Sequence, residues 1–476
     1  MLSSSARHLT RTRFPPQCHK LVKYRLFHDV SLLDDLAYRG FIQDVTRPDA
    51  LRQSLHSKPQ AVYSGVDPTA PSLHIGHLLP FMTLLHFQIR GHRIIPLIGG
   101  ATGRVGDPSG RLTERTQADI QQIEDNVIKL TASIQFFFGR ALDYAKRRLE
   151  DYGSPVSSLQ SPTVLSNLVW HEKFIMLDFL RDIGKHVRVN TMLNRESVRA
   201  RLESQQGLSF TEFTYQLLQA YDFYYLHKHH NCSIQVGGSD QWGNILAGLE
   251  LIGRYDAQSG SLALEPSAYG LTTPLLTTST GEKFGKSAGN AVWLDPGLTS
   301  VFDFYQYFLK VTDDDVEKYL KLFTLLPRAT ITELVEAHQA APEKRIAQRR
   351  LAAEVTELVH KRDGVIRAET LTKMFFESDY EGLQAENVKS AMEGDPRLVV
   401  LDSQEIQGTP VAKLAAKYGL VASNSAAKNL ISSRGLYLNN QVVPEAQHTA
   451  STSSLIDSRV AILRAGKGKL LVLVAK

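Results

Sequence analysis

The sequence predicts an α/β protein with a Rossmann-like parallel-sheet domain over residues 29–298, an α-helical domain over 299–378 and a small α+β domain over 409–476. Between residues 60 and 300, short β-branched runs alternate with longer helical patterns, which is typical of a parallel sheet. Beyond residue 300 the strand signals fade, and charge-laced sequence with helical periodicity follows. The last part combines helical patterns with a hairpin signal, so it predicts a separate small fold.

The first domain carries the clearest signals for individual elements. Strands are expected over 61–63 and 94–98, and helices over 75–90, 209–229 and 239–252. A glycine-rich segment, 99–110, follows the second strand. Doubly wound folds place ligands at the carboxyl ends of their strands, so this segment is expected to approach a ligand closely.

The remainder of the chain is interpreted in the same way. The helical domain carries a basic stretch, 342–350, followed by an apolar-periodic pattern that reaches His360. A polar segment, 379–408, is expected to be a linker. The tail then shows helical patterns over 410–418 and 424–433, and a hairpin formed by 460–463 and 470–473.

Composition limits the class of protein. With 476 residues, of which 43% are hydrophobic and 22% charged, the chain is globular in composition. No run approaches the roughly 18 to 20 consecutive apolar residues needed to cross a bilayer, which argues against a membrane-spanning role. The two cysteines, Cys18 and Cys232, are too far apart for a disulfide framework or a zinc motif. We therefore expect a reducing compartment and no protein-bound metal.

The first 28 residues have a composition of their own. They contain six basic residues, three serines and no acidic residue, which is typical of a transit peptide and predicts import into the mitochondrial matrix. A basic arm that binds RNA would have the same composition. Removing these six positive charges from the whole-chain charge of +5 leaves −1 for residues 29–476. Any RNA binding by the mature body must therefore rely on local patches.

One motif joins a predicted strand to a predicted helix, and it reads Asp67-Pro68-Thr69-Ala70-Pro71-Ser72-Leu73-His74-Ile75-Gly76-His77. A helix N-terminus carries partial positive charge and favours phosphate. The two histidines can donate hydrogen bonds to phosphoryl oxygens while pyrophosphate leaves, and Gly76 leaves room for a nucleotide. A buried, satisfied histidine pair is the alternative.

A second motif, Lys283-Phe284-Gly285-Lys286-Ser287, follows some two hundred residues later and is flanked by Gly281 and Gly289. Glycines on both sides are typical of a mobile loop, and two lysines three residues apart can close on pyrophosphate. In isolation, a solvated basic turn would explain this sequence. Its combination with the histidine motif predicts adenylate chemistry.

Four longer stretches carry a resemblance to a known family, and they are 63–69, 99–110, 213–222 and 237–244. With the two phosphate motifs, they make the chain resemble the class I aminoacyl-tRNA synthetases, and within them the bacterial-type and mitochondrial tyrosyl-tRNA synthetases. The resemblance implies activation of L-tyrosine by ATP to tyrosyl-adenylate and pyrophosphate, then transfer of tyrosyl to the 3′-terminal adenosine of mitochondrial tRNA(Tyr). It also implies that Mg²⁺ accompanies ATP and that the enzyme is a homodimer.

The same resemblance implies which residues form the site. Tyr63 and Asp222 would bind the tyrosine hydroxyl, which needs buried partners. Binding of the ammonium group is expected from Asp107, Tyr215 and Gln219, and contact with the carboxyl group or adenylate from Gln241. Binding of ATP is expected from Gly65, Asp67, Gly76, Gly238, Asp240, Lys283, Lys286 and Ser287. Catalysis is expected from Thr69, His74, His77, Lys283 and Lys286.

Spacing supports part of this assignment. Tyr215, Gln219 and Asp222 are spaced i, i+4 and i+7 on a predicted helix, so they share one face. An ordinary polar helix face would have the same spacing. Asn167 and Trp170 match an Asn-x-x-Trp pattern that the family carries near the pocket.

Contacts with tRNA are expected from two local groups of basic residues. The first lies in the helical domain, which in the family is near the anticodon, and consists of Lys344, Arg345, Arg349 and Arg350. A solvated helix face is its alternative. The tail resembles a small S4-like RNA-binding domain, with Arg464, Lys467 and Lys469 around its last turn. Its segment 423–428, however, lacks most of the basic residues that relatives carry there.

Two other functions stay open at this point. A tryptophanyl-tRNA synthetase shares the scaffold but does not need the Tyr63 and Asp222 pair for a phenol. An added role in RNA splicing or RNA binding is known for some fungal mitochondrial relatives.

Overall fold

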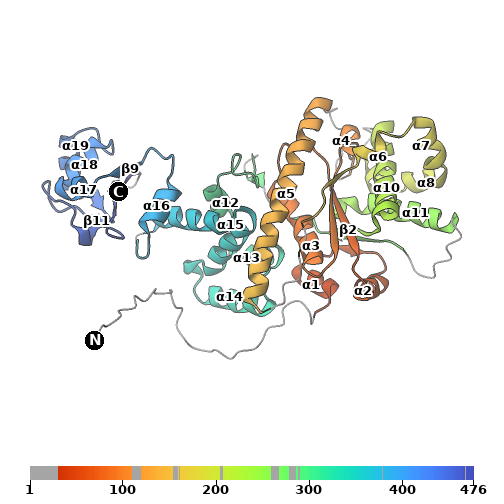
Figure 1. Cartoon of the computed structure of the whole chain (residues 1–476), viewed down its shortest axis with the longest axis horizontal. Coiled ribbons are helices and arrows are strands. Elements are labelled where there is room, and N and C mark those ends of the chain that lie inside the picture. The colour runs from red at the N-terminus through yellow and green to blue at the C-terminus, as the bar shows by residue number, and fades with distance from the viewer. Residues whose placement is uncertain are drawn as a thin grey trace, which may run out of the picture.

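The computed structural model describes residues 30–109, 119–153, 159, 161–203, 207–258, 267–277, 286–287, 290–377, 379–466 and 468–476. Side chains are described for all of these except Ser197, Lys286, Ser287 and Asn290. Along the molecule, a sheet with its helices comes first and a group of helices follows. The C-terminal part lies at the end opposite the sheet (Figure 1).

A six-stranded sheet forms the centre of the first part. In spatial order its strands are β1 (Asp44–Val45), β6 (Tyr269–Thr273), β5 (Cys232–Gly238), β2 (Ala61–Val66), β3 (Arg93–Ile98) and β4 (Leu165–Ser166). All neighbouring pairs are parallel except β1 with β6. This confirms the predicted parallel α/β class. From β2 the chain moves outward to β3 and β4, then returns to β5 on the other side, so the order reverses between β2 and β5.

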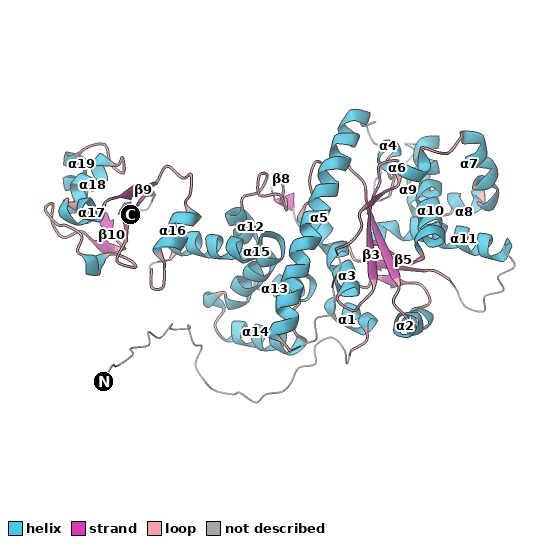
Figure 2. Cartoon of the chain, in the orientation of Figure 1, coloured by secondary structure: helices cyan, strands magenta, loops and turns pink. Residues whose placement is uncertain are grey.

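Helices cover both faces of this sheet, with α3 and α5 on one side and α10 and α11 on the other (Figure 2). The α-helices of this part are α1 (Leu32–Arg39), α2 (Pro48–Ser57), α3 (Leu78–Gln88), α4 (Thr102–Val105), α5 (Ile120–Asp151), α6 (Leu168–His171), α7 (Met176–Asp182), α8 (Val189–Leu193), α9 (Glu196–Glu203), α10 (Phe210–His230) and α11 (Trp242–Gln258). Short 3₁₀ turns are η1 (Ile75–His77), η2 (Gly184–His186) and η3 (Ser239–Gln241).

The middle part is helical, as predicted. Its helices are α12 (Val301–Leu309), α13 (Asp313–Phe323), α14 (Arg328–Ala340) and α15 (Ile346–Phe376), with the 3₁₀ turn η4 (Pro342–Lys344) between the last two. Two antiparallel strands of two residues each, β7 (Lys286–Ser287) and β8 (Asn290–Ala291), precede these helices. The helix α15 is interrupted at Lys361, whose φ of 64° is not helical. Just before the break, the Arg140 guanidinium donates a hydrogen bond to the Val359 carbonyl oxygen (2.8 Å).

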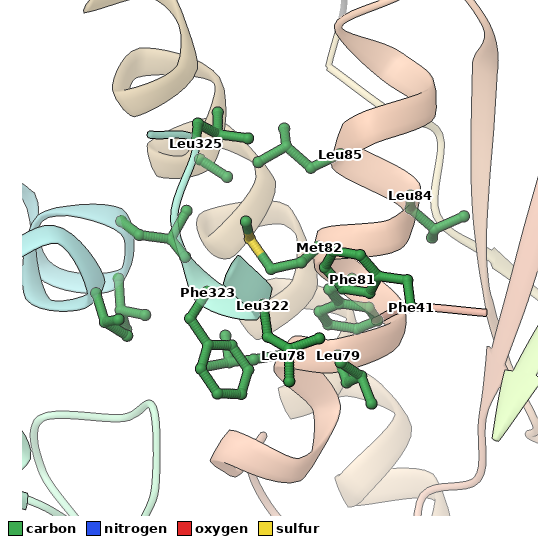
Figure 3. Close-up of a cluster of buried hydrophobic side chains, with 14 of the residues drawn as sticks. Phe41, Leu78, Leu79, Phe81, Met82, Leu84, Leu85, Leu322, Phe323 and Leu325 are labelled. Carbon is green, nitrogen blue, oxygen red and sulfur yellow. The ribbon is translucent and has the colours of Figure 1, made fainter. Parts of the chain in front are cut away.

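A single hydrophobic core joins the sheet part to the helical part. The helix α3 is apolar on all sides and almost wholly buried, because it packs on the sheet and on the helical part at once. Figure 3 shows Phe81, Met82 and Leu85 of α3 close to Leu322 and Leu325. The expected boundary at residue 298 therefore separates two kinds of secondary structure that share one core.

Buried ion pairs fix α5 against α15 within this core. The Arg148 guanidinium donates to Glu354 at 2.8 Å and also pairs with Glu357, and the Tyr144 hydroxyl donates to Glu354 at 2.6 Å. The Glu354 side chain is only 1% exposed. A carboxylate at such depth is tolerated because several donors satisfy it.

The C-terminal part is a five-stranded sheet with small helices, as the tail pattern predicted. Its strand order is β11 (Gln441–Val442), β10 (Leu436–Leu438), β12 (Val460–Ala465), β13 (Lys469–Ala475) and β9 (Leu398–Leu401). The pair β12 and β13 is the expected hairpin, and β9 with β13 is the one parallel pair among the described strands of this C-terminal sheet. The helices are α16 (Ala385–Ala391), α17 (Ser403–Gly408), α18 (Val411–Lys417) and α19 (Asn424–Ser432), with the 3₁₀ turn η5 (Thr452–Ser454).

The segment 379–408, expected to be a linker, is ordered structure instead. It contains α16, β9 and α17, and Leu398 of β9 pairs in register with Val472 of β13. Val388 of α16 lies in one apolar cluster with Met374 of α15 and Ile462 of the tail sheet. Polar residues dominate the composition of this segment, which is why the sequence suggested a linker. Its apolar residues are few, but they pack against α15 and the tail sheet.

Replacement of Arg148 by Met tests the ion pairs between α5 and α15. The change leaves Glu354 and Glu357 buried without their main cation, so it is expected to lower the free energy of unfolding by about 3 kcal/mol. Urea denaturation followed by tryptophan fluorescence measures the effect. Arg147→Met is the control, because this side chain is 36% exposed and its pair with Glu357 should contribute about 1 kcal/mol or less. Equal losses in the two variants would contradict the assignment.

Candidate active site

A pocket of about 500 Å³ opens at the carboxyl ends of β2 and β5, where the strand order reverses. Its lining includes the predicted residues Tyr63, Gly65, Asp67, Thr69, His74, Gly76, His77, Asp107, Tyr215, Gln219, Asp222, Gly238, Asp240 and Gln241. The structure thus brings together every predicted tyrosine- and ATP-binding residue apart from those of the second motif. Of that motif, Lys283 lies outside the described residues, and Lys286 and Ser287 are described only as the backbone of β7.

At one end of the pocket, the buried carboxylate of Asp222 accepts three hydrogen bonds. Asn167 Nδ2 donates to Oδ2 at 2.9 Å, whereas Trp170 Nε1 and His171 Nε2 lie 2.8 and 2.7 Å from Oδ1. The donors stand at positions i, i+3 and i+4 of the short helix α6 and its N-cap, so one helical turn directs all three to one carboxylate. His171 was not predicted, although its i+4 spacing from Asn167 was the signal that could have found it.

The Tyr63 hydroxyl lines the same pocket. Tyr63 is 1% exposed, and its hydroxyl has no hydrogen-bond partner among the described residues. Burial raises the pKa of this phenol well above its usual value, and the charge of Asp222 raises it further. The group therefore stays a neutral O–H donor. A buried hydroxyl without a partner costs free energy, which a ligand that pairs with it would recover.

A second network surrounds Asp67. The Tyr215 hydroxyl donates to Asp67 Oδ2 at 2.7 Å, and Thr102 Oγ1 donates to Asp67 Oδ1 at 2.8 Å. Thr102 in turn accepts a hydrogen bond from Asn167 Nδ2 at 3.0 Å, which links this network to Asp222. Burial and then the charge of Asp67 raise the pKa of Tyr215, so its single proton stays on the hydroxyl and points at Asp67. The Tyr215 oxygen can therefore only accept a further hydrogen bond.

A third group of polar side chains lines the pocket beside η3. Gln241 Nε2 donates to Asp107 Oδ2 at 2.7 Å, and the Ser109 backbone N–H donates to Asp107 Oδ1 at 2.9 Å. Asn244 Nδ2, on α11, donates to Gln219 Oε1 at 3.1 Å and to Gln241 Oε1 at 3.2 Å. Asn244 was not predicted. Its i+3 spacing from Gln241 was the only local signal.

The two histidines of the first motif are held by the backbone at the start of α3. The Gly76 N–H donates to His74 Nδ1, and the His74 N–H donates to His77 Nδ1, each at 3.1 Å. Because Nδ1 of His74 accepts, its neutral ring carries the proton on Nε2. Nδ1 of His77 lies 3.1 Å from the His74 nitrogen and 3.2 Å from the His74 carbonyl oxygen, so the backbone holds this ring at two groups. Burial, with a further contribution from His74, lowers the pKa of His77 to about 3. His77 is therefore a neutral donor at physiological pH.

Gly76 has a local role that differs from the expected one. A Cβ atom at this position would lie 2.8 Å from the ring of His74, so only glycine leaves room for that ring to cap the turn. The expectation that Gly76 leaves room for a nucleotide stays a prediction, and Gly76 does line the pocket.

The segment that follows β8 pairs directly with the first motif. The Ile75 N–H donates to the Val292 carbonyl oxygen at 3.0 Å, and the Leu294 N–H donates to the Leu73 carbonyl oxygen at 2.8 Å. Between these bonds, the rings of His74 and Trp293 meet edge to face, with centroids 6.0 Å apart. The backbone of residues 292–294, which follows the second motif in the sequence, is thereby paired with the histidine segment.

The basic residues expected to contact tRNA divide into two that bond to groups inside the protein, Arg345 and Arg464, and others that are exposed. In the helical part, Arg345 donates to the Leu309 and Val311 carbonyl oxygens. Arg349 pairs with Glu377 at 2.8 Å and Arg350 with Glu354 at 2.7 Å, while Lys344 is exposed.

In the tail, the Arg464 guanidinium turns inward, donating to the Tyr380 hydroxyl at 3.0 Å and to the Met374 carbonyl oxygen. Lys469 is exposed, and Lys467 lies outside the described residues. Arg464 therefore serves to join the tail sheet to the end of α15.

In the part of the chain that the structure describes, no helix is long and apolar enough to cross a membrane. No group of three or more His, Cys, Asp or Glu side chains in that part of the chain is arranged to hold a metal ion.

A Rossmann-like sheet and a histidine-lined pocket at its switch point, together with the lysine motif in the sequence, are the features of a class I aminoacyl-tRNA synthetase. A family model described as tRNA synthetases class I (W and Y) matches residues 55–377. The chain is 41% identical to the mitochondrial tyrosine--tRNA ligase of Saccharomyces cerevisiae, over 93% of this chain and 88% of that protein. It is 40% identical to tyrosine--tRNA ligase 1 of Bacillus subtilis, over 94% and 100%. The chain therefore belongs to the tyrosyl-tRNA synthetases of this class.

Solved structures agree with this family. A C-terminally truncated mitochondrial tyrosyl-tRNA synthetase from Aspergillus nidulans superimposes with a TM-score of 0.64 and 38% identity, covering 73% of this chain and 94% of that one.

Replacement of His77 by Ala tests the role of the neutral imidazole. Loss of one transition-state donor is expected to lower the rate of adenylate formation about 100-fold. Because the pKa of His77 is lowered to about 3, the ring gains a proton only as the pH falls towards that value. The ratio of wild-type to variant rates should therefore stay constant between pH 8 and pH 6 in rapid-quench measurements. A ratio that changes across this range would show that His77 titrates there.

Proposed function

We propose that this enzyme activates L-tyrosine with ATP in the pocket between β2 and β5, and then transfers the tyrosyl group to the 3′-terminal adenosine of tRNA(Tyr). The observation that carries the proposal is the pairing of an unsatisfied Tyr63 hydroxyl with a carboxylate, Asp222, in the same buried pocket. A phenol satisfies both at once, because its O–H donates to a carboxylate and its oxygen accepts from Tyr63.

The ammonium group of tyrosine requires acceptors, and the opposite part of the pocket provides them. The Tyr215 oxygen can only accept, since its proton is committed to Asp67. Gln219 Oε1 accepts from Asn244 and, as an amide oxygen, has a second lone pair. With Asp107 also lining the pocket, these groups favour a cation at this position.

Catalysis in this proposal needs no nucleophilic side chain. The tyrosine carboxylate attacks the α-phosphorus of ATP, and the bond to the pyrophosphate oxygen breaks. His74 supplies an Nε2–H donor and His77 a ring N–H donor to phosphoryl oxygens as charge develops, and they need no reorganisation because the backbone already fixes both rings. We assign the same kind of role to Lys283 and Lys286. Mg²⁺ would enter with ATP, held largely by the phosphate oxygens, and would neutralise part of their charge.

We also propose that residues 1–28 direct the enzyme to mitochondria, where it charges the organelle's tRNA(Tyr). The bacterial relative is almost as similar as the mitochondrial one, so identity does not favour either location. The support comes from the basic, serine-containing, acid-free composition of the segment.

A homodimer is proposed from an exposed apolar surface on the first part of the molecule. The side chains of Ile175, Met176 and Leu177 at the start of α7 are 67%, 71% and 74% exposed, Val189 of α8 is 60% exposed and Phe210 of α10 is 72% exposed. Large exposed apolar groups gathered on neighbouring elements mark an interaction surface more often than scattered single ones do.

Replacement of Asp222 by Asn tests the binding of the phenol. The amide lacks the charge and one of the two acceptor oxygens, so selectivity for tyrosine over phenylalanine in amino-acid-dependent pyrophosphate exchange is expected to fall at least tenfold, about the value of one hydrogen bond to a charged group. The KM for ATP should change little. Unchanged selectivity would remove Asp222 from the hydroxyl site, and wild-type exchange with tryptophan but not tyrosine would overturn the proposed substrate.

Import is tested with a fluorescent protein that follows residues 1–28. Matrix localisation is expected, because a membrane potential draws in basic presequences, and subcellular fractionation measures it. The matched control replaces Arg7, Arg11 and Arg13 with Gln and should stay in the cytosol. A cytosolic location of the unaltered fusion would contradict the proposal.

Sedimentation equilibrium tests the dimer. The chain is expected at twice its mass of 53.1 kDa, and the double change Met176→Glu and Leu177→Glu is expected to give the monomer, because charge is costly in an apolar interface. Ile128→Glu is the control, since Ile128 is equally exposed (70%) but lies on α5. A dimer that dissociates in the control and persists in the double variant would place the interface elsewhere.

A further inference from the structure

His171 makes a buried contact with Asp222 that the proposed reaction does not use directly. Its side chain is 8% exposed, and its Nε2 lies 2.7 Å from Asp222 Oδ1. An ionised carboxylate has no proton to give, so Nε2 must carry the proton and donate. The ring also meets Tyr221 edge to face, with centroids 5.6 Å apart, which limits its rotation. His171 is thus a donor in direct contact with Asp222, and its ring is held in one orientation.

The acceptor positions of Asp222 can be counted. A carboxylate offers about four lone-pair positions, two on each oxygen. Trp170 and His171 occupy both positions on Oδ1, and Asn167 occupies one on Oδ2. The described residues therefore leave one acceptor position of Asp222, on Oδ2, for a ligand. Trp170 is itself held in place by stacking on Tyr225 at 4.4 Å, so the occupancy of Oδ1 is built into the packing.

A single acceptor position suits a ring with one hydroxyl. A catechol has two adjacent hydroxyls, and these are spaced to donate one hydrogen bond to each oxygen of a carboxylate. In this pocket the second hydroxyl would meet an oxygen whose positions are already filled. It would then be buried without a partner, which opposes binding.

We propose that His171 is a specificity-determining residue, which fills the second acceptor position on Asp222 Oδ1 and so excludes tyrosine that carries an additional hydroxyl beside the first, namely 3,4-dihydroxyphenylalanine. This inference rests on the proposed activation of tyrosine in the same pocket. His171 acts through Asp222, and no step of the reaction passes through it. Loss of its N–H frees one position on Oδ1 and makes the carboxylate a partner for both hydroxyls of a catechol.

The experiment compares kcat/KM for tyrosine and for 3,4-dihydroxyphenylalanine in pyrophosphate exchange. In His171→Leu, which removes the donor at similar volume, the preference for tyrosine is expected to fall about tenfold. His171→Gln keeps an N–H donor and is expected to retain the preference. Trp170→Phe removes the other donor to Oδ1 and should lower the preference in the same direction. The KM for ATP, measured in each variant, reports any general damage to the site.

The outcomes separate the two proposals. An unchanged preference in His171→Leu and Trp170→Phe would overturn the inference, and so would an equal loss with both substrates that His171→Gln does not restore, because that result indicates a structural role alone. A lower preference in His171→Leu with retention in His171→Gln supports it. Failure of the wild-type enzyme to activate tyrosine would instead contradict the proposed function.

Discussion

A parallel sheet can leave an open crevice only where the order of its strands reverses, and in this protein that point lies between β2 and β5. Every side chain of the pocket reaches it from the end of a strand, from the segment that follows a strand, or from a helix that packs across the gap. Burial at this point sets the chemistry that follows. Polar groups so deep must be paired, and the carboxylates of Asp67, Asp107 and Asp222 are each held by at least two donors.

The networks around these carboxylates explain how a pocket can be both rigid and selective. Asn167 contacts Asp222 and Thr102, and Thr102 contacts Asp67, so the surroundings of Asp222 and of Asp67 are connected by hydrogen bonds. A side chain that is held on both sides presents only the lone pairs and protons it has not used. Selectivity then follows from what remains available, and the Tyr63 hydroxyl and the Tyr215 oxygen are the clearest cases.

The sequence predicted the fold class and most of the pocket because those features depend on local periodicity and on long motifs. The stripe of Tyr215, Gln219 and Asp222 follows from 3.6-residue spacing alone. His171 and Asn244 were missed because a single helical turn of polar residues is common on surfaces, and their partners lie on other elements. The contacts of Arg345 and Arg464 could not be predicted either, because the residue type is the same whether an arginine donates to carbonyl oxygens inside the protein or faces RNA. The segment 379–408 showed that a few apolar residues suffice for pairing when a neighbouring strand is available.

The attachment of the tail has a consequence for dividing this chain into pieces. The last turns of α15 contribute apolar side chains to a cluster whose other members come from α16 and the tail sheet, and Arg464 reaches back to the Met374 carbonyl oxygen. A cut at residue 378 would therefore expose apolar side chains at the end of α15 on one fragment. The tail fragment would keep the parallel edge strand β9, and it would lose that strand only if the cut were moved past residue 401. The natural unit for expression of the tail begins before α16, and the fragment that lacks it would need its exposed α15 residues made polar to stay in solution.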